Sequence, residues 1–237
     1  MKKKLKNFLY SRGYKVSKIN KNDLLNDNPL LAIQSRLGSN PIIFDIGANL
    51  GQTIVKVKKI FPDSYVHSFE PSKICFRKIT QDYGNVENVF LNNKAIGIAK
   101  GSLEFNEYSW SALNSFFKRA YTKSEIIDTY LVDIVSIDDY CSENNIPYIN
   151  LLKTDTEGFE FNVLQGANKM MLQNKVQFVF VEIFFHENYI GQSSFSDILN
   201  YLSNNGFKMI RFYDFDYTAD GFASRTDALF INENFIK

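Results

Sequence analysis

The chain has 237 residues, 45% of them hydrophobic and including 22 Phe and 13 Tyr, which is ample for the core of one globular α/β domain. Its two cysteines, Cys75 and Cys141, have neither the spacing of a zinc ligand set nor the density of a disulfide framework. The opening residues lack the apolar run of a signal peptide or a membrane-spanning helix. We therefore expect a cytoplasmic protein.

Charge is unevenly distributed, although the formal net charge is only +1. Residues 1–22 carry eight Lys and Arg side chains and no acidic ones, so the rest of the chain is acidic. An acidic body argues against nucleic-acid binding. The basic start would attract anionic lipid at roughly 1 kcal/mol per cation, which allows weak association with the inner membrane surface. Most such charge runs are solvated termini, however, and we favour that interpretation.

The hydrophobic pattern predicts alternating strands and helices. In chain order, the first half is expected to contain a broken helix at 23–37 interrupted by Pro29, strands at 41–46, 64–71, 85–97 and 102–108, and helices at 52–61 and 72–83. The second half is expected to contain helices at 137–145, 159–172 and 195–206, strands at 148–155 and 176–185, and a closing hairpin of 207–215 with 227–235. Residues 109–130 show no clear period and are expected to be a mobile segment.

This alternation predicts an α/β fold with a doubly wound, mostly parallel sheet and a C-terminal antiparallel hairpin at one edge. We expect residues 1–38 to form a basic N-terminal extension with a helix, and residues 39–237 to form one domain. Ligands of such sheets bind beyond the carboxyl ends of the strands. The loop after the first strand is therefore the first place to look for a site.

That loop lies in the stretch FDIGANLGQT, residues 44–53. Gly47 and Gly51 allow a tight turn and a close approach of backbone to a ligand. A dinucleotide fingerprint GxGxxG would place glycines at 47, 49 and 52, but the chain has Asn49 and Gln52. Asp45 would also repel a pyrophosphate. The loop therefore favours a ligand that is cationic or zwitterionic.

Glu70 ends the second strand, 25 residues after Asp45, where a carboxylate can accept hydrogen bonds from both ribose hydroxyls. A nucleoside with a cationic tail, such as S-adenosylmethionine, fits both acids. Two alternatives stay open at this point: a nucleotide-dependent dehydrogenase or epimerase, and a non-catalytic module that binds the cofactor.

The order of motifs resembles that of the FkbM-type methyltransferases, a family with the class I S-adenosylmethionine-dependent, Rossmann-like fold. The resemblance depends on FDIGANLGQT, HSFEPS, NNKAIG, SIDDY, LLKTDTEGFEFNVLQGA and FVFVEIFF, which follow one another from residue 44 to about 185. It implies an O-methyltransferase whose acceptor is a small molecule or glycan, most plausibly a sugar hydroxyl. Residues 1–35 and the closing hairpin lie outside these motifs.

The resemblance also implies roles for residues of the cofactor site. The methionine end would be lined by Asp45, Gly47, Asn49, Gly51 and Thr53, with Gln52 beside them; Glu70 would hold the ribose next to Pro71; Asn93 and Ala95 would border the adenine; and Asp155 would face the methyl donor.

Removal of the acceptor proton requires a positioned base, worth about 10²- to 10⁴-fold in rate. His186 follows the strand VEIFF and is our leading candidate, with Asp155 and Glu157 of KTDTEG as further catalytic candidates. Glu182 interrupts an apolar strand and needs a partner, for which we name Lys153 or the substrate. Asp155, Glu182 and His186 could together bind Mg²⁺ or Mn²⁺, although a metal is not the favoured interpretation.

Overall fold

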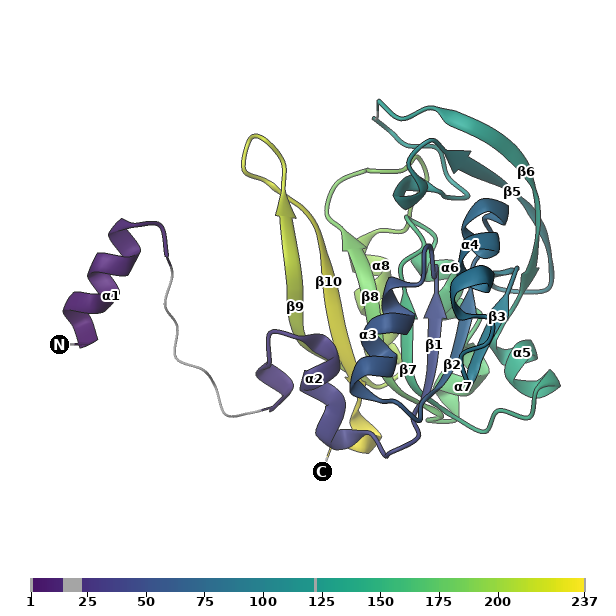
Figure 1. Cartoon of the computed structure of the whole chain (residues 1–237), viewed down its shortest axis with the longest axis horizontal. Coiled ribbons are helices and arrows are strands. Elements are labelled where there is room, and N and C mark those ends of the chain that lie inside the picture. Colours follow the sequence, from purple (N-terminus) through teal and green to yellow (C-terminus); the bar gives the residue numbers. More distant parts are fainter. Residues whose placement is uncertain (1, 15–22, 122, 237) are drawn as a thin grey trace.

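The structure, a computed structural model, describes residues 2–14, 23–121 and 123–236 (Figure 1). The elements of the first part are α1 (Lys2–Ser11), the 3₁₀ helix η1 (Asp23–Leu25), α2 (Pro29–Ile33), η2 (Gln34–Arg36), β1 (Ile42–Ile46), α3 (Gln52–Ile60), β2 (Tyr65–Phe69), α4 (Lys73–Tyr83), β3 (Val89–Asn92), β4 (Ala95–Ile96), β5 (Gly101–Tyr108) and η3 (Ser111–Leu113). Those of the second part are β6 (Ile126–Val135), α5 (Ile137–Glu143), β7 (Ile149–Thr154), α6 (Glu160–Gln165), α7 (Asn168–Leu172), β8 (Val176–Phe184), α8 (Phe195–Asn204), β9 (Phe207–Tyr217), β10 (Ala223–Asn232) and η4 (Glu233–Phe235).

The central sheet has seven strands in the order β3-β2-β1-β7-β8-β10-β9. Strands β3, β2, β1, β7 and β8 run parallel, whereas β10 pairs antiparallel with both β8 and β9. The chain order reverses at β1 and β7, the two strands that a doubly wound sheet places beside its ligand. The predicted fold class, including the C-terminal hairpin at one edge, is confirmed.

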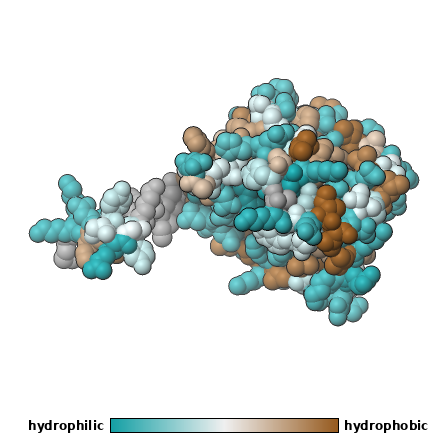
Figure 2. Space-filling model, turned by 90° about the horizontal axis from the view of Figure 1, so that it is seen from above, coloured by the Kyte–Doolittle hydropathy of each residue, from teal (hydrophilic) through white to brown (hydrophobic). Residues whose placement is uncertain are grey.

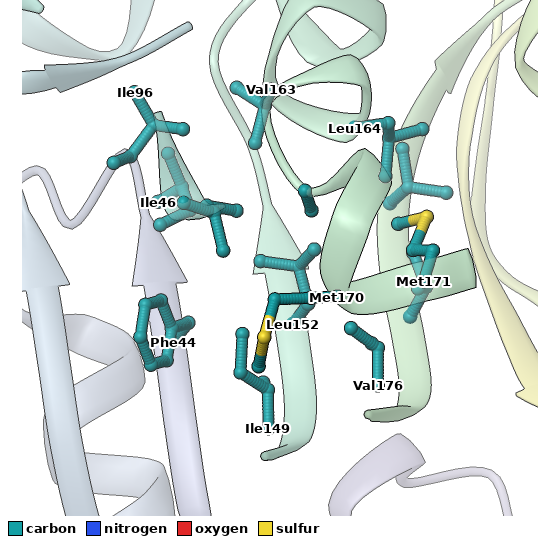
Figure 3. Packing of buried hydrophobic residues seen from close by; sticks show 14 of the residues in the cluster. Phe44, Ile46, Ile96, Ile149, Leu152, Val163, Leu164, Met170, Met171 and Val176 are labelled. Atoms are coloured by element: carbon teal, nitrogen blue, oxygen red, sulfur yellow. The ribbon is translucent and has the colours of Figure 1, made fainter. Parts of the chain in front are cut away.

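The side chains of consecutive residues of β1 point to opposite faces of the sheet, as the two-residue period of a strand requires. Ile43 packs with α2 and α3 in one buried cluster, and Phe44 packs with residues of α5, α6 and α7 in the other. Figure 3 shows the second cluster, in which Phe44 and Ile46 of β1 lie beside Leu152 of β7 and the helix residues Val163 and Met170. Burial on both faces explains why the strands are almost continuously apolar.

A second sheet of three strands, in the order β4-β6-β5, is the main feature that the sequence analysis did not predict. Its strand β6 begins inside the segment 109–130, which we expected to be mobile, and pairs antiparallel with β5 from Gly101 to Tyr108. The expected strand at 85–97 is divided, because β3 joins the large sheet and β4 joins the small one. The small sheet lies beyond the tops of β1 and β2 in Figure 1.

The helix expected at 159–172 is two helices, α6 and α7, that meet at Gly166. A Cβ at position 166 would collide with the carbonyl oxygen of Gly97, the residue after β4. Only a glycine therefore allows the α6 end to approach β4 this closely. The backbone carbonyl of Gly166 also accepts a hydrogen bond from Asp138 of α5.

Pro29 begins a helix, contrary to the sequence analysis, which had it interrupt one. It occupies the first position of α2, where no backbone donor is lost, and the Asn28 side chain caps this helix by accepting hydrogen bonds from the backbone of Leu30 and Leu31. Leu30 and Ile33 are buried against the central sheet, so this part of the expected N-terminal extension packs on the domain that we expected to begin at residue 39.

Helix α1 lies apart from the sheet in Figure 1, and its side chains from Lys3 to Phe8 are exposed. None of the helices in the described ranges is both long enough and apolar enough to traverse a bilayer.

Candidate functional site

The turn after β1 is the first structural component of the site. Gly47 and Gly51 both have positive φ, at 81° and 83°, and the backbone N–H of Gly47 donates to the carbonyl of Phe69 at the end of β2. A Cβ on Gly47 would collide with the carbonyl oxygen of Asp155 at the end of β7. The ends of β1, β2 and β7 therefore meet in one place, and α3 begins directly after this turn at Gln52.

Glu70 is buried at the end of β2, with its carboxylate already oriented by the backbone. Its Oε2 accepts a hydrogen bond from the Asn49 N–H at 2.7 Å, and its Oε1 accepts one from the Ser72 N–H at 2.8 Å. Burial raises the pKa of Glu70 to about 8, although these two backbone donors act in the opposite direction. Each carboxylate oxygen has two lone pairs, so both retain capacity for a further donor such as a ribose hydroxyl.

Asp45 does not face the cavity, although the sequence analysis placed it at the methionine end. It is fully buried in β1 and pairs with Lys153, its register partner on β7, whose Nζ lies 3.1 Å from Asp45 Oδ1. The same Nζ lies 3.3 Å from Oδ2 of Asp155. Burial raises the pKa of Asp45, while the ammonium of Lys153 opposes that shift. Asp45 therefore holds Lys153, and Lys153 in turn orients Asp155.

Three carboxylates, from Asp155, Glu157 and Glu182, converge near the ends of β7 and β8. One oxygen from each lies within 4.8 Å of the others. Glu157 has φ of 53°, a backbone conformation that costs a non-glycine residue energy, and its Oε2 accepts a hydrogen bond of 2.6 Å from Tyr189. Burial and then the neighbouring negative charges raise the pKa values of Glu157 and Glu182.

The partner of Glu182 is Arg225 of β10, and the expected pairing with Lys153 is wrong. The Arg225 Nη1 donates to Glu182 Oε1 at 3.0 Å, and its Nε donates to Asp216 on β9 at 2.7 Å. β10 runs antiparallel to β8, which brings Arg225 beside Glu182 from a segment 43 residues further along the chain.

A cavity of about 750 Å³ joins these features. Its lining combines Glu70 and a group of apolar residues with acidic groups and charged residues of the hairpin. The apolar lining consists of Phe69, Pro71, Ala95, Ile96, Phe105 and Phe116; the turn contributes Gly47, Asn49, Gln52 and Thr53; and the charged lining includes Lys153, Asp155, Glu157, Asp214, Arg225 and Asp227. Figure 2 looks onto the molecule from above, toward the carboxyl ends of the parallel strands, and hydrophilic side chains predominate near the middle of this face.

His186 lies outside the residues that line this cavity. Its side chain is exposed, its ring meets Phe222 edge-on at 6.3 Å, and its backbone carbonyl accepts a hydrogen bond from Gln192. Gly51, Asn93 and Glu182 also do not line it: Gly51 supports the turn, Asn93 donates to the carbonyl of Glu70, and Glu182 lies behind Arg225.

Several lining residues come from segments to which the sequence analysis assigned no functional role. Residues 26–30 reach the cavity from the start of α2, and Ser111, Ala112 and Asn114 reach it from η3. Ser111 donates a hydrogen bond of 3.0 Å to the side chain of Asn49, which connects η3 to the glycine turn. Trp110, next to it, is 62% exposed. Residues of this kind cannot be predicted from a polar sequence without periodicity, because tertiary contacts alone bring them to the cavity.

S-Adenosylmethionine fits the groups that are present. The turn offers bare backbone where a Cβ would not fit, Glu70 offers acceptors for a ribose, the apolar wall suits a purine, and the cavity has the size of small-molecule sites. A doubly wound sheet with this constellation at its switch point matches the architecture of the class I S-adenosylmethionine-dependent methyltransferases. The chain belongs to the methyltransferase FkbM domain family, whose model matches residues 45–209.

Known relatives share moderate identity. The chain is 25% identical over 175 residues to 2-O-methyltransferase NoeI of Sinorhizobium fredii, covering 69% of this chain and 71% of that protein. It is 28% identical over 145 residues to the hexuronic acid methyltransferase AglP of Haloferax volcanii, covering 60% of this chain and 55% of that protein. Among solved structures, a precorrin-6y C5,15-methyltransferase from Geobacter metallireducens aligns at 7% identity with a TM-score of 0.47, over 90% of this chain and 92% of that one; nothing about ligands follows at this distance.

Proposed function

We propose that the protein transfers a methyl group from S-adenosylmethionine to a hydroxyl of a sugar or glycoconjugate. The observation that carries this proposal is that one cavity is lined by Glu70 and by Asp155 and Glu157. Two relatives support this acceptor: NoeI is a 2-O-methyltransferase, and AglP is a hexuronic acid methyltransferase.

The cofactor, when bound, supplies the electrophilic methyl group. Glu70 would accept hydrogen bonds from the ribose, the backbone of Gly47 and Asn49 would border the methionine part, and Ala95 with Phe69 would hold the adenine. Methyl transfer is an in-line displacement, so most of the acceleration comes from holding the acceptor oxygen behind the methyl group. Residues 26–30 and the part of the β9–β10 hairpin beyond residue 209 lie outside the family match, line the same cavity and are suited to select the acceptor.

The acceptor hydroxyl must lose its proton as the new C–O bond forms. Asp155 is our candidate to receive it, because its side chain is 43% exposed, lines the cavity and is oriented by Lys153. His186 is a weaker candidate, since it lies outside the cavity.

Two measurements test the proposal. Calorimetry with S-adenosylhomocysteine and with NAD should give binding of the former only, and binding of NAD alone would refute the proposal. Incubation with radiolabelled methyl donor and fractionated glycans, lipids and small molecules should label a carbohydrate-containing fraction. Binding of S-adenosylhomocysteine without transfer to any fraction would instead indicate a non-catalytic module.

A further inference from the structure

We propose that Asp155, Glu157 and Glu182 bind one divalent cation at the acceptor end of the cavity. The three residues come from the end of β7, the turn that follows it, and β8, and each offers one oxygen to a group whose members all lie within 4.8 Å of one another. Oxygen ligands of this kind suit the hard cations Mg²⁺, Mn²⁺ and Ca²⁺. No ion is assigned here by the family or by the relatives.

The protein already holds each of these carboxylates through one of its two oxygens. Lys153 contacts Asp155 Oδ2 at 3.3 Å, Tyr189 donates to Glu157 Oε2 at 2.6 Å, and Arg225 donates to Glu182 Oε1 at 3.0 Å. Donors that contact the ligands rather than the metal orient those ligands in metal sites. The arrangement fixes three side chains while leaving the other oxygen of each for a shared ligand.

Glu182 provides an independent indication of a missing partner. Only 5% of its side chain is exposed, and its Oε2 is buried with no hydrogen-bond partner among the described residues. Leaving a buried carboxylate oxygen unsatisfied is costly, because the oxygen loses its hydrogen bonds to water and gains none in the protein. A cation shared with Asp155 and Glu157 would satisfy this oxygen.

The local charge also calls for a cation. Among the described residues, the carboxyl groups of Asp45, Asp155, Glu157 and Glu182 outnumber the cationic side chains paired with them, Lys153 and Arg225, and Arg225 is shared with Asp216. Asp227 of β10 lines the same cavity. A divalent cation would stabilise the charged forms of these carboxyl groups.

The spacing is compatible with such an ion. Oxygens on opposite sides of Mg²⁺ lie about 4.2 Å apart and those around Ca²⁺ about 5 Å apart, from metal–oxygen distances of about 2.1 and 2.5 Å. Asp155 and Glu157 line the cavity, so the open side of the site faces the acceptor. Water or acceptor hydroxyls would complete the coordination. The proposal adds a cation to the proposed function but does not depend on methyl transfer.

The test is a Mn²⁺ titration of the full chain followed by electron paramagnetic resonance, with and without S-adenosylhomocysteine. We expect one bound Mn²⁺ per chain, displaced by Mg²⁺ or Ca²⁺. Glu182→Gln and Asp155→Asn should each weaken Mn²⁺ binding at least about tenfold. Glu107→Gln is the matched control, because Glu107 is also buried but is held by Ser72 and Tyr130 away from the cluster, and it should bind Mn²⁺ like the wild type.

Circular dichroism and binding of S-adenosylhomocysteine establish that each variant is folded. Asp155→Asn keeps the test decisive if Glu182→Gln does not fold, since Asp155 is partly exposed. The proposal is overturned if the wild type binds S-adenosylhomocysteine but no Mn²⁺ under either condition. It is also overturned if folded variants bind Mn²⁺ as tightly as the wild type. Loss of cofactor binding in the wild type would instead count against the proposed function.

Discussion

The backbone N–H of Asn49 donates a 2.7 Å hydrogen bond to the carboxylate of Glu70, joining the glycine turn after β1 to the end of β2. This bond orients the acid before any ligand arrives, so a ribose meets acceptors that are already in position. Preorganisation of this kind reduces the entropic cost of binding.

Glu70→Ala should therefore weaken binding of S-adenosylhomocysteine. Hydrogen bonds to a charged group contribute about 1.5–3 kcal/mol each, so loss of one or two predicts at least a tenfold rise in Kd by calorimetry. Glu87→Ala, an exposed glutamate outside the cavity, is the control and should leave Kd unchanged. Equal Kd values for all three proteins would exclude Glu70 from the cofactor site.

The raised pKa of Glu70 predicts a pH-dependent stability. Its pKa rises from 4.5 to about 8 on folding, because burial disfavours the charged form. Between these values the folded state binds more protons than the unfolded state, so this group makes the free energy of unfolding fall as pH rises from about 4.5 to 8. Urea unfolding of the ligand-free protein at several pH values should show this slope reduced in Glu70→Gln. Parallel curves for the two proteins would contradict the assignment.

Removal of the Lys153 ammonium should destabilise the fold, because it leaves the buried carboxylate of Asp45 without a compensating charge. Lys153→Met is expected to cost about 3–5 kcal/mol in urea unfolding. Lys78→Met removes a solvent-exposed ion pair with Asp82 and should cost about 1 kcal/mol or less. The double variant Lys153→Met with Asp45→Asn should recover part of the loss. Equal costs for the two lysine variants would show that the buried pair has no special role.

The two candidate bases make opposite predictions. Asp155→Asn should lower kcat by about 10²-fold or more, whereas His186→Ala should change it less than twofold, since the exposed His186 lies outside the cavity. Initial rates with the acceptor fraction identified by radiolabelling check both, with S-adenosylhomocysteine affinity as the control for folding. A His186→Ala enzyme that binds the cofactor normally but turns over tenfold more slowly would restore His186 as the base.

Local pattern was sufficient for much of the fold. The strand–turn–helix unit around Gly47 and the apolar run of β8 carry their periodicity in consecutive residues, and both were predicted near their observed bounds. Strand β6 was missed because residues 126–129 are exposed and its sequence has no clear two-residue period. Its pairing with β5 defines it as a strand.

The residues of the site likewise include some that the sequence predicted and some that it did not. Glu70 was found because it ends a predicted strand, and the structure places it against the cavity. Arg225 was not found, because its position beside Glu182 depends on the register of two antiparallel strands distant in sequence. Lys153 was assigned to the wrong acid for a related reason: strand order decides that its neighbour is Asp45 of β1.

The contact between Gly97 and Gly166 lies on the far side of the wall that we assign to the purine. Because β4 is only two residues long, the position of Ala95 and Ile96 depends on how closely the next residue, Gly97, packs against Gly166 at the end of α6. A methyl group at Gly166 would collide with the carbonyl oxygen of Gly97 and displace the chain after that short strand, whereas one at Gly97 would meet the side chains of Ile134 and Phe159. The position of the wall proposed for the purine thus depends in part on two glycines behind it that do not line the cavity.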